Sequence, residues 1–203
     1  MTDDPWVMYY VVRSGVPFTL EQAMAGAGAA AVDCVERFGP FEEWHERPRK
    51  VALRAGEEEF AEIRREEPCS VVSSVLLCLP PRQRSERSEL LAALQPFTDA
   101  PRPKEQPPPP GEPAMRYVIR PGVMRTQGKA MAQAGHAALM CVEEFGDKHK
   151  ERFDAWREAG RPGRLVTENW DELHDDPEAV VVSDAGHTQV APGTETVIAL
   201  VPR

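Results

Sequence analysis

Three polar side chains stand at helical spacing in an otherwise apolar, alanine-rich segment. Lys129, Gln133 and His136 fall at positions i, i+4 and i+7, which places them along one face of a helix. Lys129 lies at the start of that helix, where the helix dipole disfavours a cation by a few tenths to about 1 kcal/mol. A lysine and free backbone amides at such a position can together hold a phosphate or a developing oxyanion. A solvated surface lysine is the alternative interpretation.

A second polar segment, DAGHTQVAPGT, begins at Asp184 and directly follows the apolar run AVVVS. Asp184 therefore stands at the end of a predicted strand, a usual place for a catalytic carboxylate on an α/β scaffold. Gly186 and Gly193 permit a tight chain reversal that would bring Asp184 and Thr188 together. An ordinary turn capped by Asp184 is the alternative.

The chain repeats itself with an offset of 107 residues. Residues 8–39 match residues 115–146 without a gap, with 19 identities in 32 positions. A period this long is not that of a solenoid, so it indicates a duplicated domain.

The two copies differ where the polar side chains stand. In the first copy the three polar positions of the helix are occupied by Gln22, Gly26 and Ala29, and residues 185–197 have no counterpart. The apolar scaffold of the helix is kept. Because both losses fall in one copy, we expect the polar helix face and the loop to form a single site in the other copy.

These patterns predict three segments: a domain at 1–97, a proline-rich linker at 98–114 and a second domain at 115–203. Strands alternate with helices, which predicts an α/β fold. We also expect Gly39 and Gly146 to end two helices in the left-handed conformation. The expected elements are strands at 8–13, 116–120, 164–167, 179–183 and 195–201, and helices at 21–38, 129–145 and 148–159.

Composition restricts the partners. The net charge of −9 argues against diffuse attraction to nucleic acid, so any RNA contact must be focused on a local site. No apolar stretch approaches the roughly 20 residues of a membrane span, and the N-terminus opens acidic, unlike a signal peptide. The four cysteines include no C-x-x-C pair, and Cys34 and Cys141 lie in apolar helical segments, which favours reduced thiols and the cytoplasm.

Other constellations are weaker. His174 and His187 have acidic neighbours but no zinc-ligand spacing, so we expect neither a metal nor another cofactor. Ser183, Asp184 and His187 could be drawn as a triad, but adjacent strand positions point to opposite faces. The glutamate-rich run at 57–67 is typical of a solvated helix face.

Two motifs together resemble the type 2 peptidyl-tRNA hydrolases: GKxxAQxxHA at 128–137 and DAGxTQxAPGT at 184–194. The resemblance covers residues 115–203 directly and residues 8–80 only through the internal repeat. It implies a four-stranded mixed sheet flanked by helices, a dimer and no metal. The implied activity is hydrolysis of the ester that joins a peptide to the 3′ end of tRNA, with peptidyl-tRNA or aminoacyl-tRNA as partner.

By the same resemblance, the catalytic residues are Lys129, Asp184 and Thr188. Asp184 would accept or orient the proton of an attacking water, Lys129 would stabilise negative charge, and Thr188 would position water or ribose hydroxyls. Substrate contacts or site supports are expected at Gln133, His136, Gly186, His187, Gln189 and Arg125.

If the family's dimer interface is kept within one chain, the first, degenerate copy takes the place of the partner. The fold expected is then two tandem copies of a small three-layer α/β fold, packed as a pseudo-dimer with one active site and monomeric in solution. Two other functions stay open. One is transfer of the aminoacyl or peptidyl group from tRNA to another acceptor, and the other is a non-catalytic module that binds acyl-tRNA or a protein.

Overall fold

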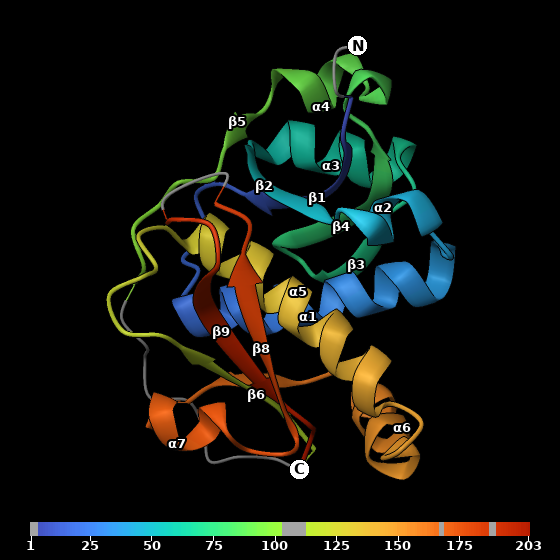
Figure 1. Ribbon diagram of the computed structural model, residues 1–203. Helices are drawn as coiled ribbons and strands as arrows, with labels where there is room; N and C mark the ends of the chain where they lie inside the picture. The colour runs from blue at the N-terminus through green and yellow to red at the C-terminus, as the bar shows by residue number, and fades with distance from the viewer. Residues whose placement is uncertain (1–3, 103–112, 167–168, 187–189) are drawn as a thin grey trace.

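The computed structural model describes residues 4–102, 113–166, 169–186 and 190–203, which form two mixed β-sheets flanked by helices (Figure 1). The first half comprises β1 (Trp6–Arg13), α1 (Leu20–Phe38), α2 (Glu42–Glu46), β2 (Arg49–Ala55), α3 (Glu57–Glu66), β3 (Ser70–Ser73), β4 (Leu76–Gln83), a 3-10 helix (Arg84–Glu86), α4 (Glu89–Ala93) and β5 (Gln95–Pro96). The second half comprises β6 (Met115–Ile119), α5 (Gln127–Phe145), α6 (Lys150–Glu158), β7 (Gly163–Leu165), α7 (Trp170–His174), β8 (Ala179–Asp184) and β9 (Thr194–Leu200).

The strand order is β3-β4-β1-β2-β5 in the first sheet and β7-β6-β9-β8 in the second. In each sheet one pair is parallel, β1 with β2 and β6 with β7, and the other pairs are antiparallel. The four-stranded prediction is therefore wrong for the first half. The fifth strand, β5, has only two residues, and it pairs with the edge of β2 where the chain leaves α4 for the linker.

Each sheet separates two apolar layers. Along β1, alternate side chains enter different cores: Tyr10 packs toward α1, whereas Tyr9 packs toward α3 and α4 with Phe60 and Ile63. In the second sheet, Trp170 of α7 covers the outer face. Figure 1 shows α1 and α5 side by side between the two sheets, with α3 and α4 outside the first sheet.

The two central helices begin with the same cap. The Thr19 side chain accepts a hydrogen bond from the Gln22 amide at the start of α1, and Thr126 accepts one from the Lys129 amide at the start of α5. Both helices consist mainly of small residues, so their backbones approach closely. The cap on α5 fixes Lys129 in the first turn of that helix.

The halves interlock reciprocally through glycines in these helices. A Cβ added to Gly135 of α5 would overlap the hydroxyl of Tyr10 in the first sheet, and a Cβ added to Gly28 of α1 would overlap the hydroxyl of Tyr117 in the second. Each tyrosine therefore requires a glycine on the helix of the other half. The hydroxyl of Tyr10 donates to the Ala27 carbonyl at 3.2 Å.

Further contacts join the halves. Met24 of α1 is buried in the core of the second half, and Met131 of α5 is buried in the core of the first. α1 also packs against β7, and α5 against β2. At the rim, Glu36 of α1 accepts from Arg157 at 2.7 Å and from Arg161 at 2.6 Å. A shared interior and a shared rim hold the two halves together.

The expectation of left-handed helix ends is wrong. Gly39 has a φ of −72° and Gly146 a φ of −56°, which any residue can adopt. The glycines are required by space, because a Cβ at either position would overlap the carbonyl oxygen of Val35 or Val142 four residues earlier.

The cysteine expectation is confirmed for the side chains themselves. Cys34, Cys78 and Cys141 are buried free thiols, and burial raises the pKa of Cys141 to about 12. Of the helices in the described ranges, none has the length and apolarity needed to cross a membrane.

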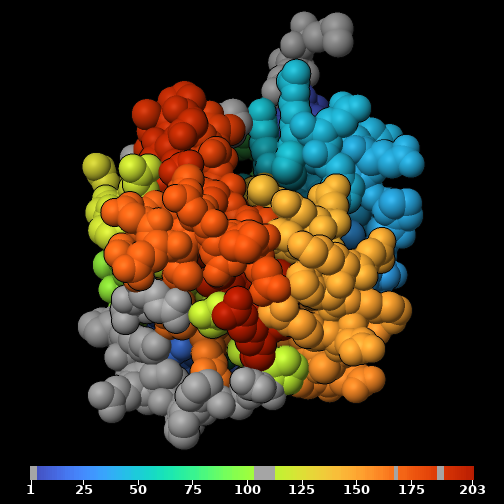
Figure 2. Space-filling view, turned by 60° about the horizontal axis from the view of Figure 1, so that its bottom comes forward, coloured from blue at the N-terminus to red at the C-terminus, as the bar shows by residue number. Residues whose placement is uncertain are grey.

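The C-terminal segment is fastened to α6 by a charged network. Arg152 donates to the Glu178 carboxylate at 3.0 Å and to the Pro202 carbonyl at 2.7 Å, and Arg203 donates to Glu178 at 3.1 Å. Figure 2 looks onto this end of the molecule, where the C-terminal end (dark red) lies between amber and orange surface of the second half. The Arg152 hydrogen bond is the main cause that holds the pKa of Glu178 down at about 2.

Glu178→Gln should therefore lower the free energy of unfolding at pH 7 by about 1 kcal/mol. Because the folded pKa lies below the ordinary value of 4.5, this contribution is complete above that pH and is lost as the pH falls toward 2. Urea unfolding at several pH values checks the sign: the difference between wild type and variant should shrink between pH 4.5 and 2. A difference that stays constant through this range would contradict the assignment.

Candidate active site

The structure brings Lys129 and Asp184 together, as expected. Lys129 stands in the first turn of α5, Asp184 is the last residue of β8, and the lysine Nζ donates to Asp184 Oδ2. The two side chains are 11% and 4% exposed. A charged pair this well buried needs further polar partners, because both ions have lost their water.

Those partners come from the same helix face and from β9. Gln133 Nε2 donates to Asp184 Oδ2 at 2.6 Å, and its Oε1 lies 3.0 Å from the hydroxyl of Thr196. The same hydroxyl lies 3.1 Å from the Val182 carbonyl. Thr196 is completely buried. Thr196 thereby supports Gln133, which supports the carboxylate.

The turn after β8 supplies the third donor. The Gly186 amide donates to Asp184 Oδ1 at 2.7 Å, and the Gly193 amide donates to the Asp184 carbonyl at 2.8 Å. Both glycines have positive φ, +78° and +77°, and a Cβ on Gly186 would lie 2.5 Å from the ring of Pro192. The tight reversal expected from the sequence is confirmed at its two ends.

Counting acceptor positions shows what Asp184 can still do. A carboxylate offers about four lone-pair positions, two on each oxygen. Among the described residues, Oδ2 takes two hydrogen bonds and Oδ1 takes one. Within the described ranges, which leave out 187–189, no donor takes the second position on Oδ1, and a water or a substrate hydroxyl would fit there.

The other expected site residues divide into three groups. His136 is half-buried on the face of α5 that also carries Lys129 and Gln133. Arg125 is exposed in the loop before α5, and no hydrogen bond within the described ranges joins it to Asp184. The residues that lie outside the described ranges are His187, Thr188 and Gln189.

A residue that the sequence did not suggest reaches the same helix face. Lys50 Nζ, from β2 of the first half, lies 2.8 Å from His136 Nδ1. Burial, together with the positive charges of Lys50 and Lys129, lowers the pKa of His136 well below its usual value. His136 is therefore a neutral imidazole at pH 7.

The other residue groups that the sequence suggested, around Ser183 and His174, make different contacts. Ser183 is exposed while Asp184 is buried, so the two side chains face opposite sides of β8 and do not form a triad. His174 lies 3.0 Å from the Glu195 carboxylate and 3.2 Å from that of Asp175. In the parts of the chain that the structure describes, His, Cys, Asp and Glu side chains form no group of three or more suited to a metal.

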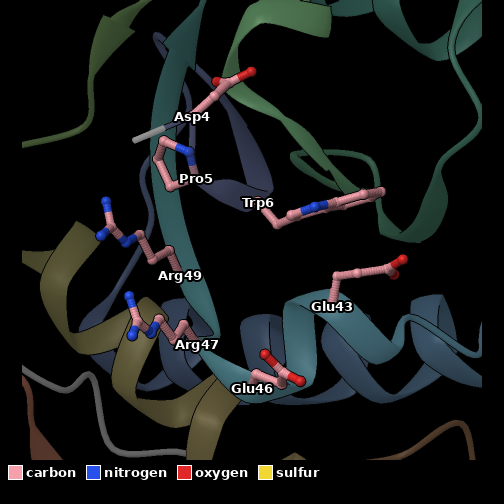
Figure 3. Close-up of a pocket in the computed structure, with 7 residues that line it drawn as sticks. All are labelled: Asp4, Pro5, Trp6, Glu43, Glu46, Arg47 and Arg49. Atoms are coloured by element: carbon pink, nitrogen blue, oxygen red, sulfur yellow. The ribbon is translucent and has the colours of Figure 1, made fainter. Parts of the chain in front are cut away.

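The first half has a small pocket of about 110 Å³, well separated in sequence from Asp184. Figure 3 shows the guanidinium groups of Arg47 and Arg49 on one side of it and the carboxylates of Glu43 and Glu46 on the other, with the Trp6 ring above. Because opposite charges line the pocket, it has no preference for an anion or a cation.

The second half of the chain is similar to known proteins. A family model, Peptidyl-tRNA hydrolase PTH2, matches residues 114–203. Peptidyl-tRNA hydrolase of Pyrobaculum aerophilum is 39% identical over 100 residues, 43% of this chain and 82% of the relative. The Haloquadratum walsbyi enzyme is 35% identical over 94 residues, 42% and 81% of the two chains. Human peptidyl-tRNA hydrolase 2, mitochondrial, is 32% identical over 102 residues, 45% and 56%.

Fold, site and these likenesses define a hydrolase domain on a mixed α/β sheet. The chain belongs to the type 2 peptidyl-tRNA hydrolase family, through its second half.

Proposed function

We propose that the second half of this chain hydrolyses the ester between a peptidyl or N-blocked aminoacyl group and the 3′ end of tRNA. The observation that carries this proposal is the buried Lys129–Asp184 pair, which stands in the half that matches the family. The relatives are named for this reaction, and the polar groups around Asp184 suit it.

In the proposed mechanism a water occupies the open acceptor position of Asp184 Oδ1. As the water oxygen attacks the ester carbonyl, its proton passes to Asp184, which later returns a proton to the departing ribose oxygen. Lys129 stabilises the charge that develops on the carbonyl oxygen, or holds the terminal phosphate. Thr188 positions the water or the ribose hydroxyls, a role that rests on the resemblance alone.

We also propose that the chain is a pseudo-dimer with one active site, built from domains at 1–97 and 115–203 joined by the linker at 98–114. Three features support this. The two strand orders coincide when β3, β4, β1 and β2 are matched with β8, β9, β6 and β7. The tyrosine–glycine contacts are reciprocal at the sequence offset of 107. Finally, each central helix packs on the parallel strand of the other half.

The place of the reaction in the cell stays a prediction. The cysteine pattern favours the cytoplasm, whereas the human relative is named as mitochondrial.

The test is deacylation of an N-acetylaminoacyl-tRNA by the full chain. Wild type should release the acyl group in buffer alone, and Lys129→Ala should be about 10²–10³-fold slower, because it removes a preorganised charge from the transition state. Lys148→Ala is the matched control, since that lysine is exposed and lies beyond the end of α5. Release only with an added amine would instead indicate acyl transfer, and binding without release would indicate a recognition module.

A further inference from the structure

Lys50 is a buried lysine, and no carboxylate in the described ranges pairs with it. It lies on β2 opposite Met8 of β1, it is 9% exposed, and its Nζ lies 4.5 Å from the centre of the Trp44 ring. Its Nζ lies 2.8 Å from His136 Nδ1, on the helix that carries Lys129. Burying an ammonium group costs free energy unless strong partners compensate, so this placement calls for an explanation.

The charges around the pair fix the direction of its hydrogen bond. Burial is the main cause that lowers the pKa of Lys50, and the Cys78 thiol of β4 acts in the opposite direction. The charges acting on His136 are those of Lys50, from β2, and Lys129, from α5 itself. An ammonium group has three donors and no acceptor. A hydrogen bond between charged Lys50 and Nδ1 therefore requires that Lys50 donates and that the imidazole hydrogen resides on Nε2.

The repeat shows that this pair exists on one side of the molecule only. Met8 corresponds to Met115, which pairs with Gly163 of β7, so Gly163 holds the place of Lys50 in the second sheet. His136 corresponds to Ala29 of α1. The two equivalent positions thus hold a glycine and an alanine, and packing alone does not require a lysine. The lysine–histidine pair is thus found only beside α5, the helix that carries Lys129 and Gln133.

We propose that Lys50 is a positioning residue for the active site of the second half: it holds His136 as the neutral tautomer with the hydrogen on Nε2. The inference rests on the proposed function. The Nε2 group then offers a fixed donor, on the helix face shared with Lys129 and Gln133, to a ribose hydroxyl or phosphate oxygen at the 3′ end of the tRNA. The first half is in this way a part of the active site.

The direct test is the protonation of His136 in the full chain, followed by ¹⁵N and ¹³C NMR of labelled histidine. In wild type the ring should show the Nε2–H tautomer at pH 7, and its titration midpoint should lie well below the ordinary value of 6.5. Lys50→Met removes a positive charge, so the pKa of His136 should rise and titration should become visible as the pH falls. Lys148→Met, the matched control at an exposed lysine, should leave the ring signals unchanged.

The kinetic test separates positioning from simple packing. Lys50→Met should lower kcat/KM for N-acetylaminoacyl-tRNA about fivefold to tenfold, mainly through KM, because one fixed hydrogen bond to substrate is lost. Its activity should fall further at acidic pH, where its His136 becomes charged. Lys50→Arg, which keeps a cationic donor, should restore part of the loss.

Unchanged His136 signals in Lys50→Met would overturn the proposal, as would changed signals without any effect on KM. The NMR readout does not depend on hydrolysis. If wild type releases no acyl group, the proposed function fails, and the role of Lys50 is then decided by the affinity for the same tRNA, which Lys50→Met must weaken.

Discussion

Asp184→Asn should lower kcat/KM for deacylation of N-acetylaminoacyl-tRNA by about 10²–10⁴-fold. The side chain keeps its shape but loses the capacity to take a proton from water. One of its two ends also becomes an amide donor. It can then no longer accept from Lys129, Gln133 and the Gly186 amide at once. Steady-state kinetics at pH 7 measures the loss, which should appear in kcat.

Asp154→Asn is the matched control, because Asp154 lies at the surface on α6, paired with Lys150. It should retain wild-type kinetics. Circular dichroism of both variants should show the wild-type fold. Full turnover by folded Asp184→Asn would remove Asp184 from the role of general base.

Gly135→Ala should destabilise the whole chain by about 1–3 kcal/mol, because the new methyl group must displace the Tyr10 hydroxyl in a close-packed interface. Tyr10→Phe alone should cost about 1 kcal/mol through loss of its bond to the Ala27 carbonyl. Combined, the two changes should cost less than their sum, since the phenylalanine ring lacks the atom that the methyl group meets. Urea unfolding measures all three variants.

Gly28→Ala with Tyr117→Phe is the matched pair on the other side of the interface, and it should behave in the same way. In addition, fluorescence and circular dichroism should report one unfolding transition for both halves. The halves would be independent of each other if the changes in free energy of unfolding were strictly additive at both pairs and two separate transitions appeared.

The site around Lys129 and Asp184 could be predicted because the sequence features that indicate it lie close together along the chain. Helical spacing gives the common face of Lys129 and Gln133, and the apolar run before Asp184 marks a strand end. The glycines of the following loop predict its reversal, which the positive φ values of Gly186 and Gly193 confirm. The internal repeat then indicates that the site lies in residues 115–203, because this copy keeps both the polar helix face and the loop.

What the sequence could not reveal depends on contacts between distant segments. The run RKVALRA of β2 has no clear alternation, because Lys50 on one of its faces is buried against α5 of the other half. Sequence spacing within β2 carries no information about a histidine 86 residues away. The glycine ends of α1 and α5 depend on space in a similar way: carbonyl groups crowd Gly39 and Gly146, and turn conformation does not select these glycines.

Oxygen-isotope incorporation during deacylation in ¹⁸O-labelled water tests whether water attacks the ester. The wild-type chain should release an N-acetylamino acid carrying one ¹⁸O atom in its carboxylate, and Asp184→Asn should slow this release by about 10²–10⁴-fold. An acid released without the label, or an acyl group recovered on an amine instead, would contradict water attack directed by Asp184.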